Sequence, residues 1–364
     1  VRAELGEHYG ADKVPQDSPI PAHILGNMWA QGWSSIYDLL EPYPGVAPLD
    51  VDSVLETINY SPQEMVRSAE SFYVSLGMDR LPNTFWERSM FSKPADRDVV
   101  CHASAWNLDG EDDLRIKMCI KQTYDELRVI YHELGHNYYQ GAYKHQPPLF
   151  QGGAHGGFHE AIGDTVVLSM TPGYLEEVGL ISSAEESEQA VINRQMQMAL
   201  DGVAFLPFGK LIDEWRWGVF SGEIAPENYN QAWWDLRTKY QGISPPVERT
   251  EADFDPGSKY HIPANVPYSR YFLAAILQYQ FHRSLCDIAG FEGPVHRCTI
   301  YGNAQAGERL RSMLEMGASE PWPDVLEALT GQREMDAIVS RIGDAAKQSL
   351  RVFTVGLGTA EGQE

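Results

Sequence analysis

The chain has few basic residues for its size. Its 364 residues include 28 lysines and arginines against 51 aspartates and glutamates, which gives a formal net charge of −23. Nucleic acids and anionic membranes bind proteins largely through basic patches that neutralise phosphates. The composition therefore argues against both partner classes and indicates an acidic, solvated surface.

Long apolar runs, internal repeats and low-complexity segments are absent from the sequence. Without a run of about 18 or more apolar residues, no membrane-spanning helix is expected. The stretch VRAELGEHYG at residues 1–10 lacks the apolar core of a signal peptide. A hydrophobic content of 43%, with no linker-like stretch, instead indicates one globular domain.

Cysteine is scarce, and whether the cysteines form disulfides indicates the cellular compartment of the protein. The four cysteines are Cys101, Cys119, Cys286 and Cys298, which allow three connectivities. Pairing of sequence neighbours would close short loops, the first across two strands expected around residues 109–110. Four buried thiols are the alternative. The even number favours disulfides, and disulfides imply an oxidising, extracellular-type compartment.

Apolar periodicity predicts a mainly α fold with a small hairpin over residues 98–121. SPQE at residues 61–64 combines a capping box with proline at the first helical position, which predicts a helix to about Leu76. Pro207 is expected to break or kink a long helix over residues 182–220. The other predicted helices cover residues 1–10, 20–40, 226–240, 268–286, 306–316 and 323–329, with a loop over 244–267.

The main chemical signal is the HExxH motif at residues 132–136. Positions four apart lie on one face of a helix, so His132 and His136 can direct two imidazoles at one metal ion. Glu133 lies beside them and can hold an attacking water. Catalytic zinc takes three protein ligands and keeps one position open. Two surface histidines on an ordinary helix are the alternative for the motif alone.

The flanking sequence offers a third ligand. Thr123 and Glu126 can form a capping box, which would place the motif in the middle of a helix. The glycines among residues 152–157 allow a tight reversal into a second helix. That helix offers Glu160 as a ligand and, one turn later, Asp164 as an acceptor for a ligating imidazole.

HELGH followed by GFHEAIGD resembles the peptidyl-dipeptidase family of angiotensin-converting enzyme. The resemblance extends over about nine-tenths of the chain, from Val1 to roughly Met335. Its other blocks are PIPAHILGNMWAQGW at 19–33, VVCHASAW at 99–106, FLPFGKLIDEWRW at 205–217, YNQAWWDLRTKYQG at 229–242, FDPGSKYHIPANVPYSRYF at 254–272 and TGQ at 330–332. It implies a helical zinc-peptidase domain over residues 1–335, with a small sheet beside the active-site cleft.

The resemblance also implies catalytic roles. The metal-site roles are zinc ligation by His132, His136 and Glu160, general-base catalysis by Glu133, and support of a ligand by Asp164. Tyr271 would face the developing oxyanion, and His102 and His261 would hold a backbone carbonyl of the substrate. From the residues alone, Tyr271 is one of 18 tyrosines and a core position fits it as well, and lone histidines are usually structural.

A clamp for the terminal carboxylate of a short peptide is implied at Gln31, Lys259 and Tyr268. The family's carboxypeptidase-type relative has arginine where this chain has Gln31, so glutamine points to release of dipeptides. Further implied substrate contacts are edge-strand pairing by Ala103 and Ala105 and a side-chain pocket lined by Phe205 and Phe208, for which core packing is the alternative. Gly202 stands where relatives often have lysine, which leaves the side-chain preference open.

Chloride dependence is a further implication of the resemblance. Arg270 matches a ligand of one anion, and Trp233 with Arg237 matches part of a second site; a surface arginine is the alternative for Arg237. Asn59 begins a glycosylation sequon, although Pro62 follows it closely. The disulfide pairs that the resemblance favours are Cys101–Cys119 and Cys286–Cys298.

Two departures from the family affect the expected function. The chain starts inside the family's catalytic domain, so lid helices are missing and apolar surface is expected to be exposed. Residues 336–364 match no family element and form a divergent C-terminal tail. The hypotheses are a secreted zinc dipeptidyl carboxypeptidase, favoured by the intact Glu133, and a catalytically silent homologue that binds peptides or a partner. An endopeptidase with an open cleft is a third.

Overall fold

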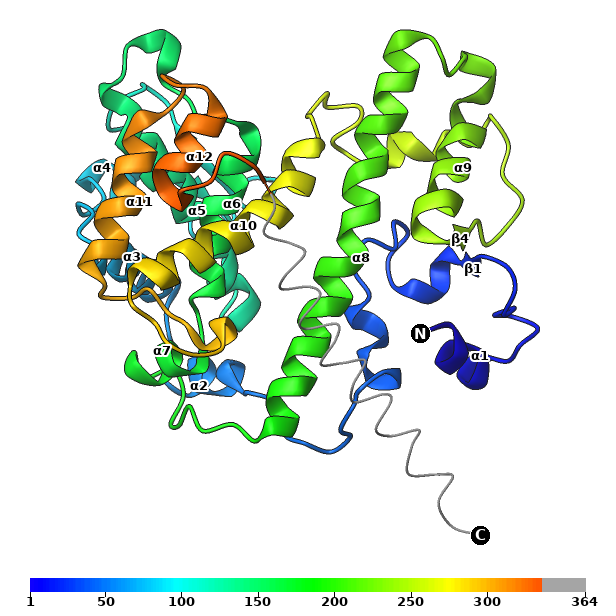
Figure 1. The fold of residues 1–364 in the computed structure, drawn as a ribbon, viewed down its shortest axis with the longest axis horizontal. Helices are drawn as coiled ribbons and strands as arrows, with labels where there is room; N and C mark the ends of the chain where they lie inside the picture. The colour runs from blue at the N-terminus through cyan, green and yellow to red at the C-terminus, as the bar shows by residue number, and fades with distance from the viewer. Residues whose placement is uncertain (336–364) are drawn as a thin grey trace. The chain divides into compact units, whose positions relative to one another are not determined.

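A computed structural model describes residues 1–335, which form two compact units built from segments distant in sequence. The first unit comprises residues 1–48 and 186–272, and the second comprises the remainder of the described chain. Figure 1 colours these segments by residue number. The single domain expected over residues 1–335 stays a prediction. The tail expected over residues 336–364 lies outside the described residues.

The first unit is organised along one long helix, α8 (Glu188–Ser221). The Ser187 side chain caps its start, and Gly222 ends it in the left-handed conformation at φ 80°. Pro207 lies inside this continuous helix, so a break there is wrong, while the alternative of a kink stays a prediction. Buried side chains between residues 200 and 211 anchor the helix on both sides of the proline, which offsets the lost backbone bond.

The helix expected over residues 20–40 is also wrong. Ile20 begins a two-residue strand that pairs in parallel with the strand at Ile243, and only short 3₁₀ turns follow it. Gly26 at φ 95° and Ala30 at φ 48° adopt conformations that no helix tolerates. The elements of this unit besides α8 are α1 (Arg2–Tyr9), β1 (Ile20–Pro21), α9 (Tyr229–Gln241), β4 (Ile243–Ser244) and the first turn of α10 (Ser269–Ile288).

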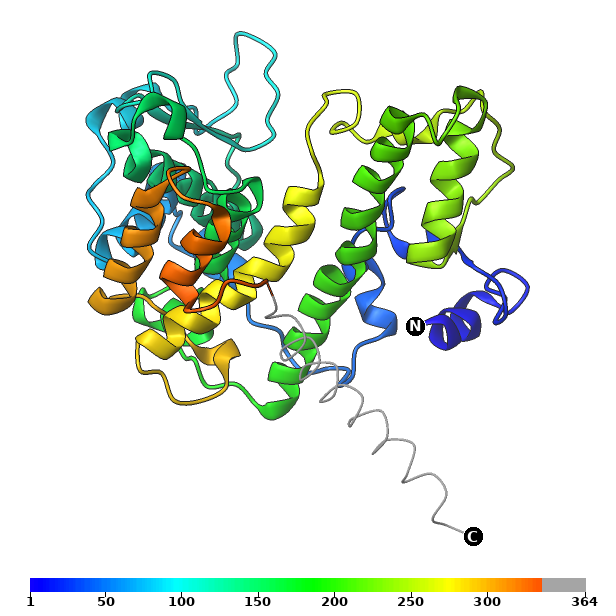
Figure 2. The ribbon, with the colours of Figure 1, turned by 45° about the horizontal axis from the view of Figure 1, so that its top comes forward.

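The second unit has its own hydrophobic core, and Figure 2 shows its helices in a second view. The predicted capping box is confirmed, since Glu64 N–H donates to Ser61 Oγ and Ser61 N–H donates to Glu64 Oε2 at 2.8 Å. Its elements are α2 (Val51–Thr57), α3 (Pro62–Ser75), α4 (Asn83–Arg88), β2 (Ser104–Asn107), β3 (Leu114–Lys117), α5 (Tyr124–Ala142), α6 (Gly156–Leu168), α7 (Pro172–Glu177), most of α10, α11 (Ala304–Met316) and α12 (Trp322–Thr330). The sequence did not reveal α2, α4 and α7, because six or seven residues are too few for a periodic signal.

The predicted hairpin and both disulfide pairings are confirmed in the second unit. Strands β2 and β3 pair antiparallel, and Cys101–Cys119 joins the segments that flank them. Cys286–Cys298 ties the last turns of α10 to the segment that follows. The expected mainly helical fold with a small sheet is likewise confirmed, and residues 1–335 contain a second two-stranded sheet, β1 with β4, that was not expected. Within residues 1–335, no helix is both long and apolar enough to cross a membrane.

Helices α5 and α6 approach closely because glycines face each other where they pack. A Cβ atom on Gly135 would lie 2.7 Å from Gly163 Cα and 3.0 Å from the Tyr73 hydroxyl. A Cβ atom on Gly163 would lie 2.6 Å from the carbonyl oxygen of His132. Only glycine permits this separation, which sets how near the side chains of α6 come to those of α5.

We expect Gly135→Ala to destabilise the protein by about 1–3 kcal/mol, the usual cost of overpacking a dense core. Gly141→Ala on the same helix is the matched control, because its Cβ would lie 3.7 Å from the nearest side-chain atom, an ordinary contact. That substitution should be neutral or stabilise by up to about 1 kcal/mol. Urea midpoints measure both variants, and equal effects would contradict the close glycine contact.

Candidate metal centre

Two neighbouring helices of the second unit bring three ligand atoms together. His132 and His136 lie one turn apart on α5, and Glu160 lies near the start of α6. His132 Nε2 is 3.4 Å and His136 Nε2 is 3.6 Å from Glu160 Oε2, and the two Nε2 atoms are 3.1 Å apart. The Nε2 atoms of the two histidines and the carboxylate of Glu160 therefore lie around one point.

These separations fit a single zinc ion. Bonds of about 2.0–2.2 Å in a tetrahedron place ligand atoms about 3.3–3.6 Å apart, close to the spacing found here. A second cluster in the described part of the chain comprises His282, Cys286 and Cys298, all buried. Its two sulfurs are joined as a disulfide, so it offers no thiolate to a metal.

The two imidazoles differ in electrostatic surroundings. Burial acts to lower the pKa of His132, but the Asp164 carboxylate, 2.8 Å from Nδ1, and the nearby Glu160 raise it well above its usual range. Burial, aided by His132 and His159, lowers the pKa of His136 well below its usual range. Asp164 holds the proton of His132 on Nδ1, which leaves the Nε2 lone pair of that ring for a metal.

Glu133 lies beside the ligands and is only 7% exposed. Burial raises the pKa of its carboxyl group, and Glu160 adds to this effect while His132 opposes it. A carboxyl group whose pKa is raised toward neutrality can both accept and return a proton during a reaction. Its chemistry is therefore that of an acid–base group.

The hairpin carries the other implicated residues of this unit. His102 is exposed, with Nδ1 2.8 Å from the Ala103 carbonyl oxygen, and Ala105 lies within β2. Asn137 Nδ2 donates to the carbonyl oxygens of Trp106 on β2, at 3.2 Å, and of Arg115 on β3, at 3.3 Å. Sequence reasoning missed Asn137, which is fully buried in the structure and whose only signal in the sequence is its position directly after the motif.

The first unit brings together the residues of the implied carboxylate clamp. Lys259 is 8% exposed, and its Nζ lies 3.3 Å from Gln31 Oε1. The ammonium also lies 4.7 Å from the ring centroid of Trp29 and 5.3 Å from that of Tyr268. Burial lowers the pKa of Lys259, and an anionic ligand beside the ammonium would act in the opposite direction.

Aromatic side chains of the same unit surround Tyr268. Its ring centroid lies 4.9 Å from those of both His261 and Tyr271. The rings of Phe205 and Phe208 lie 6.1 Å and 5.9 Å from it. Phe208 is fully buried and also packs on Trp233, so core packing applies to this residue whatever else it contacts.

Two arginines of the first unit form no ion pair within 4.0 Å among residues 1–335, although Asp255 lies near enough to Arg237 to oppose the effect of burial on its pKa. Arg237 is 2% exposed, donates to the Met28 carbonyl oxygen at 3.1 Å and lies over Trp234 at 4.6 Å. Burial lowers the pKa of Arg237 to about 10. The buried Nε of Arg270 has no hydrogen-bond partner among residues 1–335. Each guanidinium has the chemistry that an anion would satisfy, and Trp233 lies 5.9 Å from that of Arg237.

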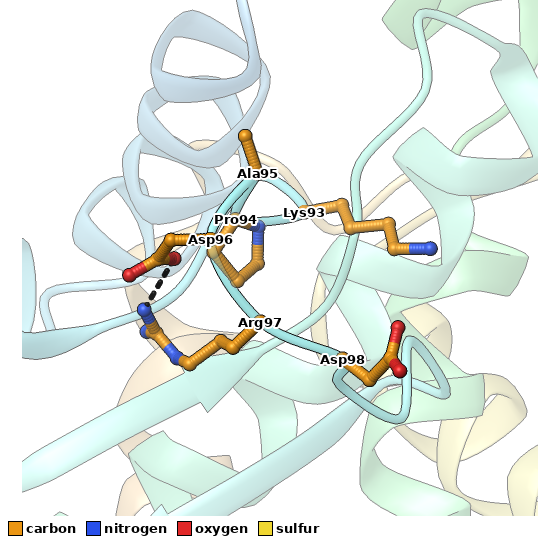
Figure 3. Close-up of a pocket in the computed structure, with 6 residues that line it drawn as sticks. All are labelled: Lys93, Pro94, Ala95, Asp96, Arg97 and Asp98. Carbon is orange, nitrogen blue, oxygen red and sulfur yellow. Dashed lines mark hydrogen bonds and ion pairs between the residues drawn. The ribbon is translucent and has the colours of Figure 1, made fainter.

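A hollow of about 540 Å³ in the second unit is formed by residues other than those of the metal centre. Six consecutive residues of a loop, 93–98, line it (Figure 3). Its ion pair joins Arg97 Nη1 to Asp96 Oδ1 at 2.9 Å, and both side chains are exposed. None of its lining residues belongs to the metal centre, so we assign it no chemistry.

Comparison with known sequences gives a consistent result. The profile of the peptidase family described as angiotensin-converting enzyme matches residues 1–339. The chain is 49% identical to the angiotensin-converting enzyme of Sus scrofa over 339 residues. These aligned residues make up 93% of this chain and 26% of that protein. Over 338 residues it is 47% identical to that of Theromyzon tessulatum, covering 93% of this chain and 55% of that protein. The chain thus spans between about a quarter and about half of these relatives, and it belongs to the angiotensin-converting enzyme family.

Proposed function

We propose that this chain carries the active site of a zinc dipeptidyl carboxypeptidase, which releases C-terminal dipeptides from short peptides. One observation carries the proposal: His132, His136 and Glu160 converge at separations suited to zinc, with Glu133 buried beside them. Family membership supports the reaction and the substrate class. The complete ligand set and the intact Glu133 argue against a silent homologue.

Zinc, when bound, polarises the scissile carbonyl and lowers the pKa of a nearby water. Glu133 accepts the proton of the attacking water and returns it to the leaving amine, a role that its raised pKa suits. Asp164 fixes the ring of His132 through the 2.8 Å contact at Nδ1. Glu160 supplies the negative charge that partly balances the ion.

The remaining catalytic roles go to donors that face the substrate. Tyr271 donates to the developing oxyanion, and His261 and His102 donate to a backbone carbonyl of the peptide. The packing of Tyr271 against His261, with ring centroids 5.3 Å apart, supports a shared role. Ala103 and Ala105 pair with the peptide as an added strand. In the described chain β2 pairs only with β3, which is compatible with such pairing.

The terminal carboxylate binds at Lys259, Gln31 and Tyr268 in this proposal. A buried ammonium without a carboxylate partner is costly, and the substrate's carboxylate would neutralise it. Gln31 stands where the family's carboxypeptidase-type relative has arginine, and its shorter, uncharged side chain favours release of two residues rather than one. Phe205 and Phe208 line the adjacent side-chain pocket.

We further propose chloride as a second ion and an extracellular location. The buried Arg237 beside Trp233, and the Arg270 guanidinium with its unsatisfied Nε, are the residues that would hold chloride. Two disulfides support an oxidising compartment, because such bonds persist outside the cytosol. Asn59 is exposed and available for glycosylation.

Metal analysis should find one zinc ion per chain. His132→Ala removes a ligand and should abolish stoichiometric zinc, whereas Asp164→Ala should weaken zinc binding about 10- to 100-fold, the usual effect of losing a ligand's hydrogen-bond partner. Exposed His145 provides the control His145→Ala, which should bind zinc as the unaltered protein does. Unchanged zinc content in the His132 variant would place the metal elsewhere.

Glu133→Gln should retain zinc and lose at least about 100-fold in kcat, because the amide cannot accept a proton. The substitution keeps the size and burial of the side chain, so the melting temperature should change little. Hydrolysis of a blocked tripeptide, together with the zinc content of the same sample, measures both properties. Substantial turnover by a zinc-loaded Glu133→Gln sample would exclude this residue as the base.

Peptides with free C-termini should lose dipeptides, and their C-terminal amides should be cleaved about 10- to 100-fold less efficiently, because the clamp binds a charged carboxylate. Lys259→Met should abolish that preference, while Lys93→Met on the exposed loop should preserve it. Products are identified by mass spectrometry. Release of single amino acids, or equal cleavage of acid and amide, would contradict the clamp.

A further inference from the structure

The Nδ1 atoms of the two proposed zinc ligands, His132 and His136, contact different groups. His132 Nδ1 contacts the Asp164 carboxylate at 2.8 Å. His136 Nδ1 instead lies 3.2 Å from Nδ1 of a third imidazole, that of His159. His159 directly precedes Glu160 on α6, so one turn of helix supplies both a ligand and the group behind another ligand.

The contact of His136 with His159 restricts where the protons lie. When His136 Nε2 faces a metal, the ring proton must be on Nδ1, which then donates to His159 Nδ1. His159 must accept at Nδ1, and it therefore carries its own proton on Nε2. That nitrogen lies 3.2 Å from the Tyr143 hydroxyl oxygen, to which it donates. An imidazole at His159 with its proton on Nε2 satisfies both of these contacts.

The surroundings of His159 hold the ring in this orientation. The Tyr139 ring, fully buried, lies with its centroid 4.5 Å from that of His159. The Tyr139 hydroxyl accepts a hydrogen bond from the Ala154 N–H at 3.0 Å, which anchors it to the loop before α6. A Cβ atom on Gly153 would lie 2.8 Å from His159 Cδ2, so only glycine there leaves space for the imidazole.

We propose that His159 is a positioning residue for the zinc ligand His136, acting as a hydrogen-bond acceptor at Nδ1 that Tyr143 holds in place from behind. The inference rests on the proposed zinc centre and adds a role that the HExxH pattern does not contain. It also gives the centre an asymmetric charge. A carboxylate behind both histidines would add an anion next to Glu160 and Asp164, whereas an imidazole orients His136 without one.

The test measures zinc dissociation constants of the full chain by competition with a chromophoric chelator. His159→Leu removes the acceptor and should weaken zinc binding about 10- to 100-fold. His159→Asn places an amide oxygen near the position of Nδ1 and should remain within about threefold of the unaltered protein, since an amide oxygen is also an acceptor. Tyr143→Phe removes only the outer contact and should have a smaller effect than His159→Leu.

Two controls separate positioning from packing. His145→Leu alters an exposed histidine close to Tyr143 in sequence and should leave zinc affinity unchanged. Melting temperatures of the metal-free variants report on folding, and the ligand-field spectrum of the cobalt-substituted protein reports on ligand geometry. A distorted spectrum in His159→Leu and a normal one in His159→Asn would support the inference.

Two results would overturn the inference alone, and two others would refute the zinc centre on which it rests. Zinc affinity of His159→Leu equal to that of the unaltered protein would show that His136 needs no partner. Equal weakening by His159→Asn and His159→Leu would show that ring packing, not the acceptor, matters. Failure of the unaltered chain to bind zinc, or zinc binding that survives His132→Ala, would instead refute the zinc centre itself, and the inference with it.

Discussion

The close contact between Gly135 and Gly163 allows the two helices that carry the candidate metal ligands to pack together. Because a Cβ atom on either residue would collide with the other helix, the backbones of α5 and α6 approach as closely as glycine allows. At that distance His132 reaches both Glu160 and Asp164, and His136 reaches His159. A wider separation would leave the histidines of α5 facing carboxylates that they could not share with one ion.

How much of this the sequence predicts depends on whether a feature is local. The one-turn spacing of His132 and His136 and the capping box at residues 61–64 need only the geometry of a helix, and the structure contains both helices. The irregular course of residues 20–40 depends on the left-handed Ala30, and no propensity indicates a positive φ at alanine. Pro207 continues a helix because its neighbours are buried, which is a property of the tertiary structure.

The same distinction applies to the site. Glu160 could be identified from its motif, but the partner of His136 could not. Whether a carboxylate, an amide or a third imidazole lies behind that ring depends on which face of α6 meets α5, and the facing glycines decide this. Asn137 likewise acquires its partners only when β2 and β3 lie against the helix. Residues that orient a ligand thus become visible only in three dimensions.

Two buried cations contrast with the acidic composition of the chain. The net charge is −23, yet Lys259 and Arg237 of the first unit are buried and form no ion pair within 4.0 Å among residues 1–335. Buried charges of this kind are costly unless an anion joins them. An acidic exterior would repel anionic ligands at long range, so the buried cations must recognise them at short range, where screening by water is weakest.

The interleaved segments of the two units bear on how the chain acquires its structure. Residues 1–48 can pack in their unit only after residues 186–272 have been synthesised. Residues 49–185 pack with the segment that starts at Leu273, which is synthesised later still. During synthesis each unit would stay incomplete until its later segment appeared, and the incomplete unit would expose apolar surface. Pairings between residues so far apart in sequence favour slow folding, with a long interval in which chaperones, rather than the native contacts, must shield the chain.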